Sequence, residues 1–411
     1  MSKIFIRSVG SVLTGTLISQ LIPIAGTLVL ARIFDPASFG IFSAWLGGVL
    51  FLGVVLTCRF EMSLAVEEDG LSRRNAVVMT LVTIMLMSMI ASGLVLLAVL
   101  FSGLEWVTRL PLALLVSAVP TAALVASNQV LQNWAAADGR YRHLTIMRIA
   151  QASSVVLLQI GFGMVWSDAV GLGFGYLAGA FLGLLVAVSV APLQGVRLIH
   201  LGAELRVFWR THRRFAMYSL PADAVNAAAA QLPLLVVAAR FGSEAAGLLA
   251  MAMRMLGAPM SLLAASVLDV FKRHAGQAYR ERGECRSEYL HAFRILLLVA
   301  VAAAVVIALG AELAFAVVFG EVWLGAGTMV LWLLPRFAIG FVSSPLSYMV
   351  YIAGKQQLDL IWQLALLAMT LATLFLFDSV QWALVSYGLG YGVLYLVYLA
   401  MSYQFSLGSR R

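Results

Sequence analysis

The sequence contains few charged residues and few cysteines or histidines. Only 11% of its 411 residues are charged, whereas 62% are hydrophobic; a typical soluble domain is about 25% charged. The apolar residues form long runs, such as LLLVAVAAAVVIA at 296–308, which do not alternate with polar residues. Runs of about 20 apolar residues are typical of membrane-spanning helices, and an outer-membrane barrel would need alternation. We therefore expect an all-α polytopic membrane protein.

The sequence also lacks the patterns of enzymes and metal proteins. Its two cysteines, Cys58 and Cys285, lie far apart and imply no disulfide framework. None of the five histidines has another at ligand spacing, and no phosphate-binding loop or nucleophile elbow is present. The glycine-rich stretch GLGFGY at 171–176 has no preceding strand, so it indicates helix packing. We expect no metal, no cofactor and no catalysis, and transport driven by an ion or substrate gradient.

The positive charges fix an orientation for twelve predicted spans. With the N-terminus inside, twenty of the 27 Lys and Arg residues lie in inner segments, three in outer loops, and four in or near the spans. By the positive-inside rule both termini are cytoplasmic, and the formal charge of +8 needs no nucleic-acid partner. The spans are 10–31, 41–64, 76–100, 111–134, 146–166, 170–191, 215–239, 245–269, 291–317, 329–353, 359–377 and 380–402.

One inner segment, 192–214, is long, basic and partly amphipathic. We expect it to form a surface helix held by anionic lipid, with a cytoplasmic protein partner as the alternative.

A weak internal repeat relates the two halves of the chain. The stretch VLARIFDPASFG aligns with VVAARFGSEAAG when Gly40 is placed on Gly247, and each stretch lies at the outer end of an odd-numbered span. Six spans separate the copies, so the halves have the same orientation. This predicts a parallel repeat of two six-helix bundles, with domains at 1–205 and 206–411 and the substrate path between them.

The two copies of the repeat also suggest local roles. Asp35 can cap the helix that follows it, with Pro36 in the first turn, and Ser243-Glu244 offers similar capping chemistry in the second copy. Arg32 and Arg240 either anchor helix ends to lipid headgroups or guard the outer mouth of the path.

Charged and polar residues inside the spans are the candidates for function, because each charge costs about 2.5–3.5 kcal/mol at mid-helix. Since residues two apart on a helix do not face each other, we expect Arg59 and Glu61 to have separate partners, or one of them to point into a cavity. Arg148 and Arg294 lie near span ends, where reaching toward the interface is an alternative. The candidates for a cationic and polar substrate path are Arg59, Glu61, Arg148, Asn226, Gln231, Arg254, Arg294 and Arg336.

The seventh span is the best candidate for a bent helix. Asp223 lies between Pro221 and Pro233, and proline frees backbone groups that other groups must satisfy. We expect coupling or gating residues at Asp223, Pro221 and Asp269, with a plain kink as the alternative. The balance of charge within the membrane is positive, which suits a phosphate or diphosphate because guanidinium groups bind these with two hydrogen bonds.

Four motifs together resemble one family. They are LVLARIFDPASFGIFSA after span 1, RFEMSLAV closing span 2, YSLPADAVNAAAAQLPLL with its continuation through span 8, and SSPLSYMVYIAGKQQLDL in span 10. The chain resembles Wzx-type O-antigen translocases of the multidrug/oligosaccharidyl-lipid/polysaccharide exporter superfamily. The resemblance implies a two-bundle fold in the bacterial inner membrane and flipping of undecaprenyl-diphosphate-linked oligosaccharide, by alternating access with proton or cation coupling through a cationic cavity.

The resemblance places the family's arginine–glutamate pair on Arg59 and Glu61, and its span 7 proline on Pro221. It also suggests a polysaccharide polymerase and a chain-length regulator as partners. Three alternatives remain. A drug or cation antiporter of the same superfamily would have a more acidic lumen. A polymerase or glycosyltransferase would have large outer loops, and a peptidoglycan-precursor flippase would have two further helices.

Overall fold

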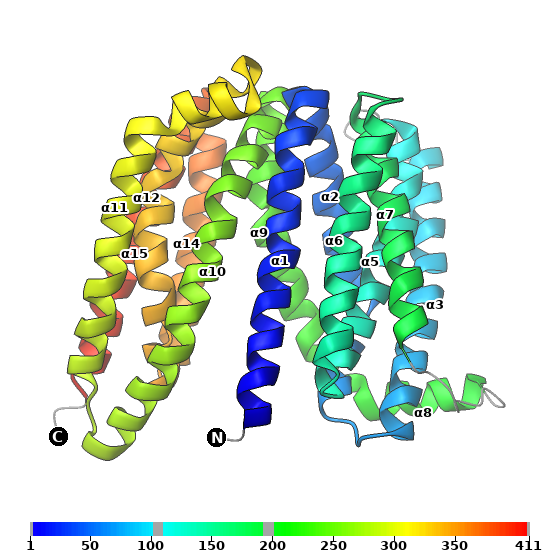
Figure 1. Cartoon of the computed structure of the whole chain (residues 1–411), viewed down its shortest axis with the longest axis horizontal. Coiled ribbons are helices and arrows are strands. Elements are labelled where there is room, and N and C mark those ends of the chain that lie inside the picture. The colour runs from blue at the N-terminus through cyan, green and yellow to red at the C-terminus, as the bar shows by residue number, and fades with distance from the viewer. Residues whose placement is uncertain (1–2, 102–109, 192–200, 409–411) are drawn as a thin grey trace. The chain divides into compact units, whose positions relative to one another are not determined.

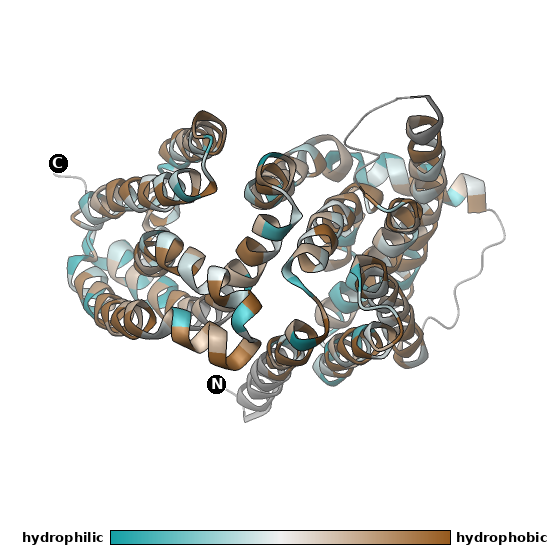
Figure 2. Cartoon of the chain, turned by 90° about the horizontal axis from the view of Figure 1, so that it is seen from above, coloured by the Kyte–Doolittle hydropathy of each residue, from teal (hydrophilic) through white to brown (hydrophobic). Residues whose placement is uncertain are grey.

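The computed structural model describes residues 3–101, 110–191 and 201–408, and within these ranges all regular structure is helical (Figure 1). Ten helices or helical segments are long and apolar enough to cross a membrane, and Figure 2 shows that their turns are predominantly hydrophobic. Two more, α1 with 31 residues and α10 with 40, have sufficient length. These twelve helices correspond one to one with the twelve predicted spans.

The elements up to the middle of the chain are α1 (Lys3–Ile33), α2 (Pro36–Leu56), η1 (Phe60–Ala65), α3 (Leu71–Phe101), α5 (Leu112–Ala137), α6 (Tyr141–Gly163), α7 (Ala169–Val190), α8 (Leu201–Arg214), η2 (Phe215–Ser219) and α9 (Leu220–Phe241). The remaining elements are α10 (Ser243–Arg282), α11 (Arg286–Phe319), η3 (Glu321–Trp323), α12 (Leu324–Leu346), α13 (Met349–Ile352), α14 (Gln356–Leu376) and α15 (Val380–Ser406).

Several span boundaries differ from the prediction, and two of them have a clear physical cause. The second span ends at Leu56 and not near 64, because Cys58 and Arg59 adopt positive φ angles of 49° and 59° that a right-handed helix does not accommodate. The eighth span continues as helix to Arg282, well past the predicted 269, because its polar end is rich in residues that favour helix. Hydropathy locates the apolar part of a helix and not the helix end.

The backbone divides into two compact units, Met1–Ala239 and Arg240–Arg411. In the first unit α6 packs along α7, where the predicted glycine packing is confirmed: a Cβ atom on Gly175 or Gly179 would overlap the backbone of Gln159 or Val155. The predicted domain boundary at 205/206 stays a prediction.

In the second unit, the core lies between α10, α11, α12 and α15. Phe271, Tyr289 and Leu346 are buried there, and the Tyr289 hydroxyl shares a 2.7 Å hydrogen bond with the Ser402 hydroxyl. Cys285 lies in the same core and donates to the Met349 sulfur. This core fixes the ends of α10 and α11 where the chain turns between them.

The two predicted helix caps have different outcomes. The Ser38 amide donates to the Asp35 carboxylate at 2.8 Å and Pro36 is the first residue of α2, so this cap is confirmed. The expected capping by Ser243-Glu244 is wrong: α10 begins after Gly242, whose φ of 94° suits glycine, and no side chain of the described residues caps the helix. Gly242 thus occupies the N-cap position in the second copy of the repeat, where the first copy has Asp35.

Candidate functional site

One arginine joins two carboxylates at the end of α2. Arg59 donates from one terminal nitrogen to Glu61 Oε1 at 2.8 Å, and its Nε lies 2.7 Å from Asp223 Oδ2 of α9, without the alignment of a hydrogen bond. Glu61 is only 4% exposed, while Arg59 and Asp223 are 21% and 33% exposed. We call these three residues the charge cluster. With all three ionised it carries a net charge of −1.

The local backbone explains why Arg59 and Glu61 meet. The expectation that they need separate partners is wrong, because it assumed a continuous helix through residue 64. Arg59 instead has a left-handed conformation and Glu61 lies in the first turn of η1, so the two side chains converge. The buried Glu61 Oε2 accepts no hydrogen bond in the part of the chain that the structure describes.

Asp223 is carried by an irregular helix, as expected for the seventh span. The five residues that precede α9, Phe215–Ser219, form a π-helix (η2). The Leu220 amide donates to the carbonyl of Phe215, five residues earlier. Such widened turns occur frequently at functional sites. Pro221 follows directly and lacks an amide hydrogen to continue either pattern. The irregularity therefore lies immediately before Asp223.

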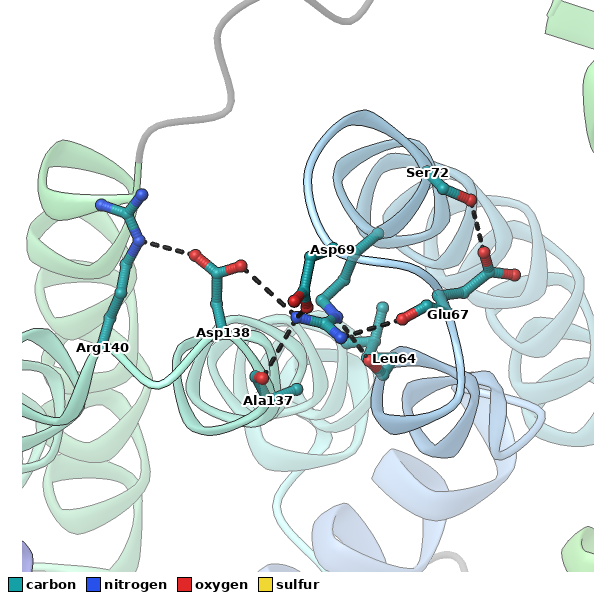
Figure 3. Close-up of polar contacts among 8 residues, drawn as sticks. Leu64, Glu67, Asp69, Ser72, Ala137, Asp138 and Arg140 are labelled. Atoms are coloured by element: carbon teal, nitrogen blue, oxygen red, sulfur yellow. Dashed lines mark hydrogen bonds and ion pairs between the residues drawn. The ribbon is translucent and has the colours of Figure 1, made fainter. Parts of the chain in front are cut away.

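Arg73 of α3 fixes the other end of the loop that carries Arg59 and Glu61. Its partners Leu64, Glu67, Asp69, Ala137 and Asp138 are labelled in Figure 3. This buried guanidinium donates to the backbone carbonyls of Leu64 and Glu67, each at 2.8 Å, and to that of Ala137 at 3.1 Å. It also pairs with the Asp69 and Asp138 carboxylates. Arg73 thus links the α2–α3 connection to the end of α5 and holds the segment after η1 in place.

Arg336 forms a second site, within the second unit. Its guanidinium carbon lies 4.5 Å from the ring centre of Tyr391, 5.0 Å from that of Tyr387 and 5.2 Å from that of Phe337. One terminal nitrogen is buried without a hydrogen-bond partner among the described residues. Arg336, Phe337 and Tyr395 line a cavity of about 160 Å³. A cation bounded by aromatic faces can bind an anion or stack against a sugar ring.

The other predicted residues differ in their burial. Gln231 packs against Gly47 of α2, and Asn226 is exposed. Arg148 in α6 and Arg254 in α10 are half-buried, whereas Arg294 in α11 and Arg32 near the end of α1 are exposed. The side chain of Asp269 lies outside the described residues.

Arg240 has an identifiable structural role. It donates to the carbonyls of Leu374 and Phe377 at 2.6 and 3.1 Å and lies near the Asp378 carboxylate. It therefore satisfies backbone acceptors at the C-terminal end of α14, and a role at the outer mouth stays a prediction.

Sequence reasoning missed Arg73 and the tyrosines around Arg336. Arg73 has the sequence signature of any inner-loop arginine, and its burial depends on a loop whose conformation was not foreseen. Tyr387, Tyr391 and Tyr395 are spaced by four, so they lie on one face of a helix. That spacing was the signal that could have revealed them.

Most of the chain is similar in sequence to one known family. A family model described as polysaccharide biosynthesis protein matches residues 29–327. No curated protein matches the sequence.

The fold is similar to solved transporter structures. A multidrug resistance MATE family transporter of the MOP superfamily, in an inward-facing conformation, has a TM-score of 0.62 and 16% identity, with 93% of each chain covered. The lipid II flippase MurJ, inward closed, has a TM-score of 0.66 and 13% identity, covering 95% of this chain and 87% of its own. These similarities confirm the predicted fold class.

A third solved structure is a MOP superfamily transporter from Pyrococcus furiosus, described as having a binding pocket of reverse polarity. It has a TM-score of 0.50 and 16% identity, with 97% of this chain and 94% of that chain covered.

Proposed function

The chain belongs to the polysaccharide biosynthesis protein family, and on that premise we propose that it is a flippase for a lipid-linked oligosaccharide. It has the multi-pass fold of MOP superfamily transporters. The proposed substrate is a polysaccharide repeat unit on an undecaprenyl diphosphate carrier, moved from the inner to the outer leaflet of the bacterial inner membrane. The family match along residues 29–327 is the observation that carries this proposal.

The surroundings of Arg336 support an anionic, sugar-bearing substrate. A diphosphate and an acidic sugar both present oxygens that a guanidinium binds with two hydrogen bonds, and Tyr395, which lines the same cavity, offers an aromatic ring to a sugar. Arg336 has a buried nitrogen without a protein acceptor among the described residues, so a substrate oxygen would satisfy it. A cation antiporter would gain nothing from this arrangement.

The charge cluster supports coupling to protons. Its two acids, Glu61 and Asp223, share the guanidinium of Arg59. One acid can therefore be protonated while the other stays ionised and paired with Arg59. Protonation of Asp223 would release its contact with Arg59 and free the first turn of α9 to move. In this scheme Asp223 accepts the proton and Pro221 and the π-helix allow the movement.

The orientation and the partners complete the proposal. The distribution of Lys and Arg favours cytoplasmic termini. A polysaccharide polymerase and a chain-length regulator would act on the flipped unit and are the proposed partners.

Complementation tests the function. A strain lacking the flippase of its own polysaccharide locus should regain surface polysaccharide when it expresses the wild-type chain. Arg336→Ala and Arg254→Ala should abolish the polysaccharide at unchanged protein levels in the membrane. Arg280→Ala, which removes an exposed arginine from the polar end of α10, is the matched control and should complement. Full complementation by both Arg336→Ala and Arg254→Ala would exclude a cationic path, and export of cationic drugs alone would favour an antiporter.

A further inference from the structure

The helix α8 has two faces with different properties. One face packs against the rest of the first unit, and Phe208 is buried there. The Trp209 indole donates to the Thr83 hydroxyl of α3 at 3.0 Å, and His212 Nε2 lies 2.9 Å from a Glu67 carboxylate oxygen. Figure 1 shows α8 lying across the end of α3 and not along it. The helix is therefore at the level where the spanning helices of this unit end.

The opposite face is an arginine stripe, Arg206, Arg210, Arg213 and Arg214. All four side chains are exposed, and none forms an ion pair with an acid in the described ranges. The spacing of three, four and seven residues places them on one side of the helix. Beside them Val207 is 64% exposed. A stripe of four unpaired cations with an exposed apolar residue is unusual for a surface that meets only water.

We propose that the arginine stripe binds anionic phospholipid headgroups and that this binding stabilises the charge cluster. Charge complementarity and the position of α8 at the ends of spanning helices favour a lipid surface as the occupant. Each basic residue near an anionic membrane strengthens binding about fivefold. The stripe as a whole therefore discriminates strongly between anionic and neutral lipid.

Contacts from α8 lead directly to the charge cluster. The rings of Phe208 and Trp209 each pack edge-on against Phe60, with ring centres 5.2 Å apart. Phe60 is fully buried and lies between Arg59 and Glu61 in the chain. Lipid that holds α8 in place therefore also holds the backbone that presents Arg59 and Glu61.

The same helix reaches the other side of the cluster. α8 continues through η2 into α9 without a break, so Asp223 lies nine residues after Arg214 on one helical segment. Both halves of the Arg59–Asp223 pair are thus attached to α8, one through Phe60 and the other through the chain itself.

Hydrogen exchange of the purified full-length chain in nanodiscs tests the proposal. The two lipid compositions are phosphatidylcholine alone and phosphatidylcholine with about one third phosphatidylglycerol. In wild type, phosphatidylglycerol should slow amide exchange in 57–66 and 215–223 on the order of tenfold. The variant R206Q/R210Q/R213Q should lose this effect, and R273Q/R280Q/R286Q, which removes the same charge from exposed positions on α10 and α11, should keep it.

A second variant separates lipid binding from its transmission. Phe208→Ala keeps every arginine of the stripe but removes one of the two rings that pack on Phe60, so lipid should still slow exchange within α8 and should slow it less in 57–66. An equal lipid effect in wild type and the stripe variant, or none in wild type, would overturn the lipid site. An undiminished effect in 57–66 for Phe208→Ala would overturn the route through Phe60. Exchange is measured without substrate, so these outcomes do not depend on the proposed flippase activity.

Discussion

Removing the Arg59 guanidinium should destabilise the protein in a pH-dependent way. In Arg59→Ala, the Glu61 carboxylate loses its only ion-pair partner among the described residues while its side chain stays 4% exposed. Breaking a buried pair costs roughly 3–5 kcal/mol. The Asp223 side chain is one third exposed, so water can solvate its carboxylate once the ion pair with Arg59 is removed. The loss of that pair adds at most about 1 kcal/mol to the destabilisation.

Protonation sets a ceiling on this penalty. Protonating a glutamate with an ordinary pKa at pH 7 costs about 3.7 kcal/mol. If burying the unpaired Glu61 carboxylate costs more than this, Glu61 takes up a proton in the folded variant, and the loss of stability stays at that value. We therefore expect a loss close to this ceiling, about 3.7 kcal/mol at pH 7, shrinking by roughly 1.4 kcal/mol for each pH unit below that. The sign follows because Glu61 would be neutral in the folded variant and ionised when unfolded, so higher pH favours unfolding.

Equilibrium unfolding in mixed micelles, followed by tryptophan fluorescence, measures this difference. The double variant R59A/E61Q leaves no buried charge at this position and should recover roughly 2 kcal/mol of the loss. Arg59→Gly should be about 1 kcal/mol more stable than Arg59→Ala, since glycine adopts the φ of 59° without strain. A loss for Arg59→Ala below about 1 kcal/mol, or one unchanged between pH 7 and pH 5, would refute a buried, charged Glu61.

Three further outcomes follow from the structure. Asp223→Asn should flatten the pH dependence of transport, measured as rate against pH in reconstituted vesicles; an unchanged profile would remove Asp223 from coupling. Burial, with a smaller contribution from Glu288, raises the pKa of Cys285 to about 11, so at pH 8 its maleimide labelling, followed by peptide mass spectrometry, should be about 100-fold slower than in the unfolded chain; equal rates would show that the thiol is not buried. Gly179→Val should destabilise by about 1–3 kcal/mol through overlap with Val155, whereas Gly161→Ala, where the space is open, should be neutral or stabilising in the same unfolding assay.

The sequence predicted the features that depend on many residues at once. Twelve spans could be counted because hydropathy and arginine placement each sum over long segments, and local errors average out. The cap at Asp35 was also predictable, since it depends on a side chain and an amide three residues apart. The glycine packing of α7 on α6 was predictable because small residues at a membrane-helix interface let two backbones approach closely.

The features that failed depend on backbone conformation at single residues. The pairing of Arg59 with Glu61 required two consecutive left-handed residues, Cys58 and Arg59, and neither residue type signals that conformation. The burial of Arg73 in turn depends on the loop that follows. Arg336 was predicted as a candidate, but two of its aromatic partners, Tyr387 and Tyr391, come from a helix some 50 residues later, and only the packing of α12 on α15 brings them together.

Transbilayer movement of a lipid-linked oligosaccharide tests the central claim most directly. Purified wild-type chain would be reconstituted into vesicles with a fluorescent oligosaccharide on an undecaprenyl diphosphate carrier, and a membrane-impermeant quencher would report how much has crossed. We predict rapid crossing with wild type and crossing close to the protein-free rate with Arg336→Ala. Wild-type crossing no faster than in protein-free vesicles, with the protein shown to be inserted and folded, would contradict the account.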